Sequence, residues 1–377
     1  MHDYIEAGKI VVTLNCYYYP NLLEGNAYEK VDIIFQCDNN KIDIILITLI
    51  DKNKEMVYQE IEKLLTNHNV VFAEPAYLCE SYLIPNDPEY RFLWGLNKIE
   101  APSAWDYTTG DTNVVVGVVD SGIDYTHLDI KDNLWVSQNG FFGWNFADNN
   151  SDSIDRTGHG THVAGTIGAV GNNAIGITGV CWNIKVASLK IGNHAFSIAA
   201  GIAAIDYANK NNISILNNSW GGRDYSNSLK YAIGQYKGIF VASVGNNGLN
   251  NDYYPDYPAS YDCENIISVA ASDQNNELTS FSNFGAVSVD IAAPGTNILS
   301  LTLNNGYDYS RGTSMAAPHV AGAAALLKSY LPDLTIANIK NIILSSVDRN
   351  TNLSGKILTG GVLNVNRMIS MARAENL

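Results

Sequence analysis

Short apolar runs alternate with helical patterns from residue 114 onward, and this alternation constrains the fold more than any other feature. Residues 114–119 read Val-Val-Val-Gly-Val-Val, a continuous apolar run typical of a strand that is buried on both faces. Strands that alternate with helices predict an α/β fold, with a mostly parallel sheet and helices on both faces. Further strands are expected at residues 184–191, 213–216, 239–244 and 266–270, with helices at 162–169, 196–209 and 226–236 between them.

A smaller α+β unit is predicted before this alternation begins. We assign residues 1–80 to it, residues 81–95 to a linker and residues 96–377 to the main domain, because Pro85 and Pro88 mark an irregular connection. The usual arrangement for the small unit is two helices packed on an antiparallel sheet. Its strands are expected at residues 9–14, 31–37, 42–48 and 70–72, its main helix at 51–67 and a second helix at 20–30.

The charge balance of the chain excludes some partners. Its 23 basic and 38 acidic residues give a net charge of −15, so it is a poor ligand for nucleic acid or an anionic membrane surface. No apolar run reaches the roughly 18 residues that a membrane span needs. The cysteines are dispersed without a C-x-x-C pair, which predicts free, buried thiols and neither a disulfide framework nor a zinc site. They are Cys16, Cys37, Cys79, Cys181 and Cys263.

Two polar residues, Asp120 and His159, are expected at the edge of a parallel sheet where functional groups usually lie. Asp120 follows the strand run at 114–119, in the motif DSGID, where it either caps a turn or orients a histidine. His159 lies between two glycines at the expected start of a helix and is the better candidate for a base. His162 is expected to be a structural residue within that helix, because no Glu or Cys completes a zinc site with the pair.

An amide and a hydroxyl add two more catalytic residue types. Asn246 follows the strand at 239–244 and can donate to an oxyanion, whereas the Asn-Gly pair after it is typical of a turn. Ser314 precedes a run of helix formers, where unpaired N–H groups and the helix dipole favour negative charge. It is either a helix N-cap or a nucleophile. Pro318 is expected near the helix start, where a missing N–H costs least.

The order of these residues gives them a common interpretation, since Asp, His and Ser follow one another in this order in subtilisin. The motifs DSGID, GHGTHVAG, NNSWGG, VGNNG and GTSMAAPHVAG are family motifs, and they run through most of residues 86–346. The chain resembles the subtilisin-like serine peptidases, the subtilase family, with an N-terminal propeptide of the inhibitor type. A lipid or ester hydrolase would instead carry a G-x-S-x-G elbow and the order Ser, Asp, His.

The resemblance implies a serine endopeptidase that hydrolyses peptide bonds through an acyl-enzyme intermediate. Ser314 would be the nucleophile, His159 its general base and acid, and Asp120 the group that orients and stabilises the imidazole. Asn246 would donate to the oxyanion together with the backbone N–H of Ser314. The alternative is a regulatory or processing protease with one narrow protein substrate.

The resemblance also implies contacts with protein or peptide substrates. Residues 219–221 resemble the strand edge that pairs with an extended substrate backbone. Trp220 is larger than the residue common there and would narrow or fill the pocket for the fourth residue before the cleaved bond. We expect an apolar or aromatic residue in the primary pocket, because the sequence places no acid there. The residues expected to line these subsites are Ser219, Trp220, Gly221, Ser243, Val244 and Gly245.

Structural calcium is implied by the loop at residues 170–177, which resembles the family's calcium loop of carbonyl groups and an Asn side chain. An ordinary Gly- and Asn-rich surface loop is the alternative. No organic cofactor is expected. The calcium ligands would be Asp87, Asp129, Val170, Asn173, Ile175 and Ile177.

The first 80 residues resemble the family's propeptide, above all in a helix followed by the sequence VVFAEPAY. Such propeptides assist folding and then lie with their C-terminus in the active site, so the propeptide would be an intramolecular inhibitor. The resemblance implies self-cleavage between about Tyr77 and Pro85. No basic-then-apolar export signal follows Met1, which slightly favours a cytoplasmic location, whereas a zymogen is typical of secretion.

Overall fold

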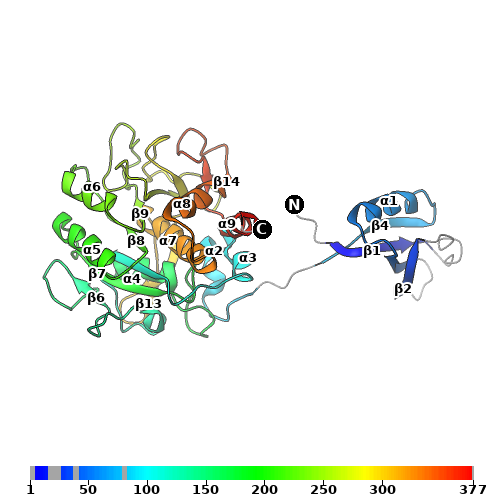
Figure 1. The fold of residues 1–377 in the computed structure, drawn as a ribbon, viewed down its shortest axis with the longest axis horizontal. Helices are drawn as coiled ribbons and strands as arrows, with labels where there is room; N and C mark the ends of the chain where they lie inside the picture. The colour runs from blue at the N-terminus through cyan, green and yellow to red at the C-terminus, as the bar shows by residue number, and fades with distance from the viewer. Residues whose placement is uncertain (1–4, 16–26, 37–41, 79–82, 376–377) are drawn as a thin grey trace. The chain divides into compact units, whose positions relative to one another are not determined.

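The computed structural model describes residues 5–15, 27–36, 42–78 and 83–375. The chain forms two compact units, Met1–Ser81 and Tyr82–Leu377 (Figure 1). Each unit has its own sheet and its own hydrophobic core, so each is stabilised by apolar burial within itself.

The smaller unit is an antiparallel sheet with a helix packed on it. Its elements are β1 (Ile5–Leu14), β2 (Tyr28–Gln36), β3 (Asp43–Leu49), α1 (Lys54–Leu64) and β4 (Val70–Tyr77). The strand order is β2-β3-β1-β4, and each neighbouring pair with a defined register is antiparallel. Buried and less buried residues alternate along β1 and β3, so that one face carries Ile10 and Ile45 into a core shared with Val57 of α1.

The strands predicted for this unit are confirmed, and its helix is shorter than predicted. Asn53 caps α1, because its side chain accepts a hydrogen bond from the N–H of Glu55 at 3.0 Å. The helix expected at residues 20–30 is wrong in its last residues, since β2 already begins at Tyr28. Residues 20–26 lie outside the described residues.

The larger unit is built on a mostly parallel sheet, as predicted. Its strand order is β14-β15-β11-β10-β9-β8-β5-β7-β6, in which β14 and β15 are antiparallel and the other neighbours are parallel. The carboxyl ends of β5, β8 and β9 therefore meet at one edge. The strands are β5 (Val115–Asp120), β6 (Gly143–Asn145), β7 (Lys185–Lys190), β8 (Ile215–Asn218), β9 (Ile239–Ser243), β10 (Ile266–Ser272), β11 (Ile291–Pro294), β14 (Asp348–Arg349) and β15 (Gly361–Val362).

Helices cover both faces of this sheet (Figure 1). Val116 and Val118 of β5 belong to the core beneath α4 and α7, and Val119 belongs to the core beneath α5 and α6. Successive side chains of a strand point to opposite faces, so β5 holds both layers together. The helices are α2 (Trp94–Lys98), α3 (Ala101–Trp105), α4 (His159–Gly168), α5 (Ile198–Lys210), α6 (Asn227–Gly234), α7 (Thr313–Tyr330), α8 (Ile336–Ser345) and α9 (Val365–Glu375), and an antiparallel pair, β12 (Ile298–Thr302) and β13 (Gly306–Ser310), lies apart from the main sheet.

Residues 83–95, which the sequence assigns to a linker, are bonded into the larger unit. The N–H of Leu83 donates to a carboxylate oxygen of Asp106 at 2.8 Å. The N–H of Glu89 donates to the carbonyl of Gly176, also at 2.8 Å. The second bond holds the chain at the beginning of the larger unit to the loop expected to bind calcium.

The thiols and the surface add few constraints on function. Cys181 is buried and Cys263 is half-buried, both as free thiols, while Cys16, Cys37 and Cys79 lie outside the described residues.

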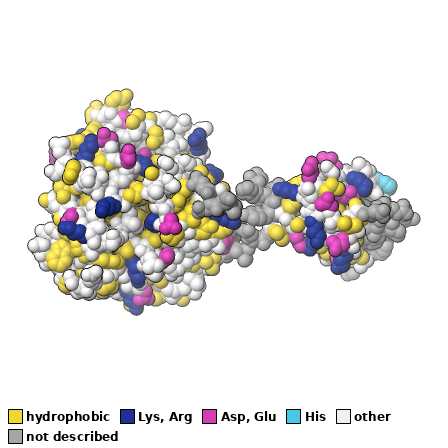
Figure 2. Space-filling view, in the orientation of Figure 1, with side chains coloured by type: hydrophobic (Ala, Val, Ile, Leu, Met, Phe, Trp, Pro, Cys, Tyr) yellow, Lys and Arg dark blue, Asp and Glu magenta, His cyan; other side chains and the backbone are white. Residues whose placement is uncertain are grey.

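Within the described part of the chain, no helix combines the length and apolarity that crossing a membrane requires. Figure 2 shows Lys and Arg side chains scattered over the face in view.

Candidate active site

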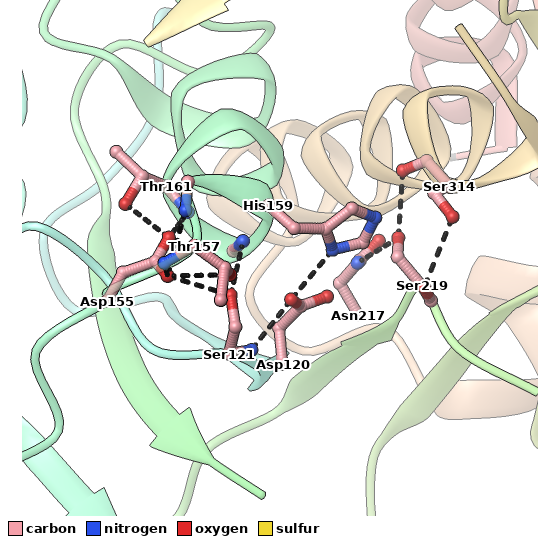
Figure 3. A network of polar contacts seen from close by, with 11 residues as sticks. Asp120, Ser121, Asp155, Thr157, His159, Thr161, Asn217, Ser219 and Ser314 are labelled. Atoms are coloured by element: carbon pink, nitrogen blue, oxygen red, sulfur yellow. Dashed lines mark hydrogen bonds and ion pairs between the residues drawn. The ribbon is translucent and has the colours of Figure 1, made fainter. Parts of the chain in front are cut away.

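Two of the predicted catalytic residues meet at the carboxyl end of β5. Asp120 is the last residue of β5, and His159 is the first residue of α4. Nδ1 of His159 lies 2.7 Å from Oδ1 of Asp120 (Figure 3). Because an ionised carboxylate only accepts hydrogen bonds, Nδ1 carries the proton and Nε2 keeps its lone pair. The imidazole is therefore set up to act as a base through Nε2.

The charge of Asp120 favours the protonated form of His159. Burial by itself disfavours the imidazolium, but the charge and hydrogen bond of Asp120 outweigh it and raise the pKa of His159 above its usual value. Asp120 is fully buried, and its Oδ2 has no hydrogen-bond partner among the described residues. Its charge is little screened there, so it can stabilise an imidazolium that forms during a reaction.

Asp155 holds the backbone around His159, and sequence reasoning missed it. Its Oδ1 accepts from the Ser121 hydroxyl at 2.9 Å and from the N–H of Thr157 at 2.8 Å. Its Oδ2 accepts from the N–H and the hydroxyl of Thr161 at 3.0 and 2.8 Å. Burial would raise the pKa of Asp155, but these bonds outweigh burial and lower it. Its place four residues before a candidate base is the signal that could have found it.

Ser314 lies in the first turn of α7, as predicted. Gly312 precedes it with a φ of 143°, in the region that favours glycine. The expectation for Pro318 is wrong, because this proline lies inside α7, where it lacks the N–H that would bond to the Ser314 carbonyl. The Ser219 hydroxyl donates to that carbonyl at 2.8 Å instead. The start of α7 is thereby tied to the segment after β8.

The Ser314 hydroxyl is turned toward Ser219 in this structure. Its Oγ donates to the Ser219 carbonyl at 3.1 Å, and it makes no hydrogen bond with His159, although both residues are described. The imidazole nevertheless lies between Asp120 and Ser314 (Figure 3). In enzymes without substrate such catalytic bonds are often long or misaligned.

Asn246 presents its amide nitrogen beside Ser314. Its Oδ1 accepts from the N–H and the hydroxyl of Thr313 at 2.8 and 3.1 Å, and this fixes which end of the amide faces α7. Its Nδ2 group donates to no group of the described residues, and the residue is exposed. The N–H of Ser314 belongs to the first helical turn, where N–H groups lack helical acceptors. Asn246 is therefore held against the first turn of α7, which carries Ser314.

The two segments expected to bind substrate follow neighbouring strands. Ser219 comes directly after β8, and Ser243 is the last residue of β9, with Val244 and Gly245 after it. The structure therefore brings both predicted segments to the sheet edge that carries Asp120. An acid that the sequence could not place, Asp256, lies against Gly221 and Gly245 of these segments.

Two aromatic residues border the site. Trp220 is only 8% exposed, and its ring packs beside Gly201 of α5, so it fills space in the core beneath the segment. Phe196, which sequence reasoning missed, lies after β7 with its ring centroid 6.5 Å from that of His159. Its side chain carries no polar hydrogen-bonding group.

The predicted calcium ligands form a second cluster. Oδ1 of Asp129 accepts from Nδ2 of Asn173 at 2.8 Å, and its Oδ2 accepts from the N–H of Ile177 at 2.9 Å. Asp87 accepts from the N–H of Asn173 at 3.2 Å. The other two expected ligands, Val170 and Ile175, are joined to the same cluster through their N–H groups. The N–H of Val170 donates to the carbonyl of Asp129, and the N–H of Ile175 donates to the side chain of Asn173.

The charges in this cluster fit a divalent cation. Burial raises the pKa of Asp129 to about 7, and the negative charge of Asp87 adds to the rise against opposing hydrogen bonds. Neither carboxylate has an ion pair with a basic side chain of the described residues. The described part of the chain has no group of three His, Cys, Asp or Glu side chains suited to a metal. An ion here would therefore need carbonyl and amide oxygens as well, which is the donor chemistry that calcium prefers.

Comparisons with known proteins agree with this geometry. A sequence profile described as the subtilase family, peptidase S8, matches residues 111–363. The chain is 38% identical over 312 residues to a thermophilic serine proteinase of Bacillus sp. (strain AK1), covering 81% of this chain and 74% of that protein. It is 36% identical over 279 residues to subtilisin DY of Bacillus licheniformis, covering 72% and 96%. A solved structure of a protease from Pseudoalteromonas arctica superposes with a TM-score of 0.68 at 29% identity, covering 76% and 99%. The chain belongs to the subtilase family of serine proteases.

Proposed function

We propose that the chain is an endopeptidase in which Ser314 is the nucleophile, His159 the general base and acid, and Asp120 the group that orients His159. The observation that carries the proposal is the 2.7 Å bond between Asp120 and His159, which leaves Nε2 as the basic atom on the side of Ser314. Asn246 and the N–H of Ser314 are the donors for the oxyanion.

In the acylation step, Oγ of Ser314 attacks the substrate carbonyl carbon while Nε2 of His159 takes the hydroxyl proton. The charge that develops on the carbonyl oxygen is stabilised by Nδ2 of Asn246, which is held in place because Oδ1 is bonded to Thr313. The imidazolium then gives its proton to the leaving amine, and the C–N bond breaks. A water molecule then attacks the acyl carbon while Nε2 of His159 takes a proton from it. His159 gives this proton to Oγ of Ser314 as the acyl group is released.

We infer that residues 1–80 are a propeptide that the enzyme removes from itself and that inhibits it afterwards. The separate sheet and core of this unit support the inference, as does its position before the residues that match the family profile. The cleaved bond is expected between about Tyr77 and Pro85. Cleavage before Leu83 would keep the bond between Leu83 and Asp106 within the mature enzyme.

The test compares wild type with Ser314→Ala, and uses Ser151→Ala, at an exposed serine, as the matched control. Wild type and the control should react with a fluorophosphonate probe, digest casein and lose the N-terminal unit on a gel. Ser314→Ala should do none of these and stay at full length. Equal lengths of all three proteins would contradict self-processing. Absence of both labelling and digestion in wild type would contradict the peptidase assignment, and labelling without digestion would favour the narrow-substrate alternative.

We also propose a structural calcium ion bound by the side chains of Asp87, Asp129 and Asn173 together with carbonyl groups of the 170–177 loop. A bound ion would neutralise two buried carboxylates. The calcium-free protein should therefore melt about 5–10 °C below the protein at saturating calcium. Asp129→Asn should abolish the effect of a chelator, whereas Asp132→Asn, at an exposed acid, should preserve it. A melting temperature that does not respond to excess chelator in wild type would contradict the site.

A further inference from the structure

Asp256 lies between the two segments expected to bind substrate. A Cβ atom built on Gly221 would collide with its Oδ1, and one built on Gly245 would lie 3.1 Å from its Oδ2. A side chain at Gly221 would leave no room for the carboxylate, and one at Gly245 would press against it and collide with Nδ2 of Asn283. The acid therefore touches one segment after β8 and the other after β9.

Backbone pairing fixes Asp256 in this place. The N–H of Gly222 donates to the carbonyl of Tyr257 at 2.8 Å, and the N–H of Tyr257 donates to the carbonyl of Gly222 at 2.7 Å. This antiparallel bridge holds the residue after Asp256 against the residue after Gly221. The carboxylate is thus positioned by rigid main-chain contacts, as a recognition group should be.

The carboxylate of Asp256 has no structural task of the usual kind. An Asp in a turn commonly accepts from the N–H two residues on, but that residue is Pro258, which has none. Asp252, in the same loop, shows the contrast: its carboxylate accepts from the N–H and the hydroxyl of Ser288 at 2.9 and 2.7 Å. Asp252 is used to hold the loop together, and Asp256 is not.

Asp256 is buried without a partner. It is 8% exposed, and its Oδ1 has no hydrogen bond within the described part of the chain. Burial raises its pKa to about 6, and the charge of Arg223 only partly opposes this rise. Arg223 itself is exposed and makes no ion pair with Asp256. A buried acid without a partner is costly to the fold, which indicates that a ligand completes it.

The distance from the reactive serine suits a long side chain. The Ser219 carbonyl accepts from Oγ of Ser314 at 3.1 Å, and Gly221, against Asp256, stands two residues further on. Two residues of extended chain span about 7 Å, which is within reach of the four-carbon stem of a lysine. On the other segment, Gly245 directly precedes the oxyanion donor Asn246.

We propose that Asp256 binds the cationic side chain of a lysine or arginine at the substrate residue immediately before the cleaved bond. The preference for basic residues that follows replaces the apolar preference expected from the sequence. The inference rests on the proposed function, because it places the cleaved bond at Ser314. The charged end of the substrate side chain meets the carboxylate, and its apolar stem lies along the segments after β8 and β9.

The kinetic test uses peptides that differ only in the residue before the cleaved bond: Lys, Arg, Phe or Leu. Wild type should cleave the Lys and Arg peptides with a kcat/KM about 30-fold or more above that for Phe and Leu. Asp256→Asn should lose this preference, so that its kcat/KM for Lys and Arg no longer exceeds that for Phe and Leu. Asp262→Asn, at an exposed acid of the same loop, should retain the preference. A wild type that favours Phe or Leu, or an Asp256→Asn variant that still favours Lys, would overturn the proposal.

A second measurement separates this inference from the proposed function. Benzamidine carries a cationic amidine, and benzamide is its neutral counterpart of nearly the same shape. Benzamidine should slow fluorophosphonate labelling of wild type, benzamide should not, and neither should affect labelling of Asp256→Asn. Charge-dependent protection without peptide cleavage would support the cation site while contradicting the endopeptidase. Equal protection by both compounds, or protection of Asp256→Asn by benzamidine, would overturn the cation site even if wild type cleaves peptides.

Discussion

The site has two sides that treat their buried polar groups differently. On the histidine side, made by Asp120, Asp155 and His159, each of these residues is tied to other groups of the chain, and both oxygens of Asp155 accept hydrogen bonds. On the substrate side, Asn246 keeps its Nδ2 for another partner, and Oδ1 of Asp256 has none within the described residues. The first side is closed in the sense that bonds within the protein orient each of its residues, although Oδ2 of Asp120 accepts none among the described residues, and the second side is left open.

This difference separates positioning from recognition. A base must hold one orientation before substrate arrives, so the bonds that orient His159 have to be made within the fold. A recognition group has to keep its bonding capacity for the ligand, and the protein bears the cost of leaving it unpaired. Substitutions on the two sides should therefore affect activity differently. Those on the closed side should slow the cleavage of all substrates, and loss of Asp256 should change the order of kcat/KM among substrates.

The largest effect is expected for Asp120→Asn on the closed side. An amide nitrogen placed against Nδ1 would favour the tautomer with its proton on Nε2, which removes the lone pair that takes the Ser314 proton. We expect kcat to fall about 10⁴-fold with Lys and Phe peptides alike. Steady-state kinetics on both peptides measures this, with the melting temperature as a check of folding. A loss that differs strongly between the two peptides would break the division into two sides.

A smaller loss is expected for Asn246→Ala, which removes an oxyanion donor. Because the oxyanion exists only during the reaction, kcat should fall about 10²–10³-fold while KM changes little. Asn247→Ala, at the exposed neighbouring residue, is the matched control and should keep kcat. If KM rose and kcat stayed constant, Asn246 would instead contribute to ground-state binding.

The parts of this fold that could be predicted are those with a local signal. β5 and β9 are continuous apolar runs with a polar residue just beyond or at their ends, so Asp120 and Asn246 could be assigned to the functional edge in advance. β11 and β15 escaped prediction, because strands of four and two residues carry no measurable periodicity. They are strands only because a neighbouring strand offers its hydrogen bonds.

The contacts of Asp155 and Asp256 were beyond sequence reasoning for a related reason. Each is defined by contacts with residues far away in the chain, Asp155 with the Ser121 hydroxyl and Asp256 with Gly221. In the sequence, an isolated Asp in a polar loop looks the same whether its carboxylate accepts several hydrogen bonds or none. The distinction that matters for function, bonded or unbonded, exists only in three dimensions.

A stability effect is expected for Asp155→Asn. Each carboxylate oxygen faces at least two donors, so an amide in either orientation turns its own N–H groups toward them. We expect the free energy of unfolding to fall by about 2 kcal/mol, measured by denaturant unfolding, with Asp152→Asn at an exposed, Arg-paired acid as the control. Because the pKa of Asp155 is lowered in the fold, its contribution is present above the unfolded value and is lost as pH falls through the folded one. A variant as stable as wild type would show that the closed side needs no carboxylate.

The smallest effect is a pH dependence of substrate ranking. Protonation of His159 slows both peptides and cancels in the ratio of kcat/KM for Lys over Phe, which leaves Asp256 as the titrating group. Arg223 is the charged neighbour of Asp256 and opposes the rise in its pKa. Since burial raises the pKa of Asp256 to about 6 and a cation binds only the ionised form, the ratio should fall about 10-fold between pH 8 and pH 5. In Asp256→Asn the ratio should be flat over the same range. A wild-type ratio that is constant with pH would show that the open side does not recognise substrate through this charge.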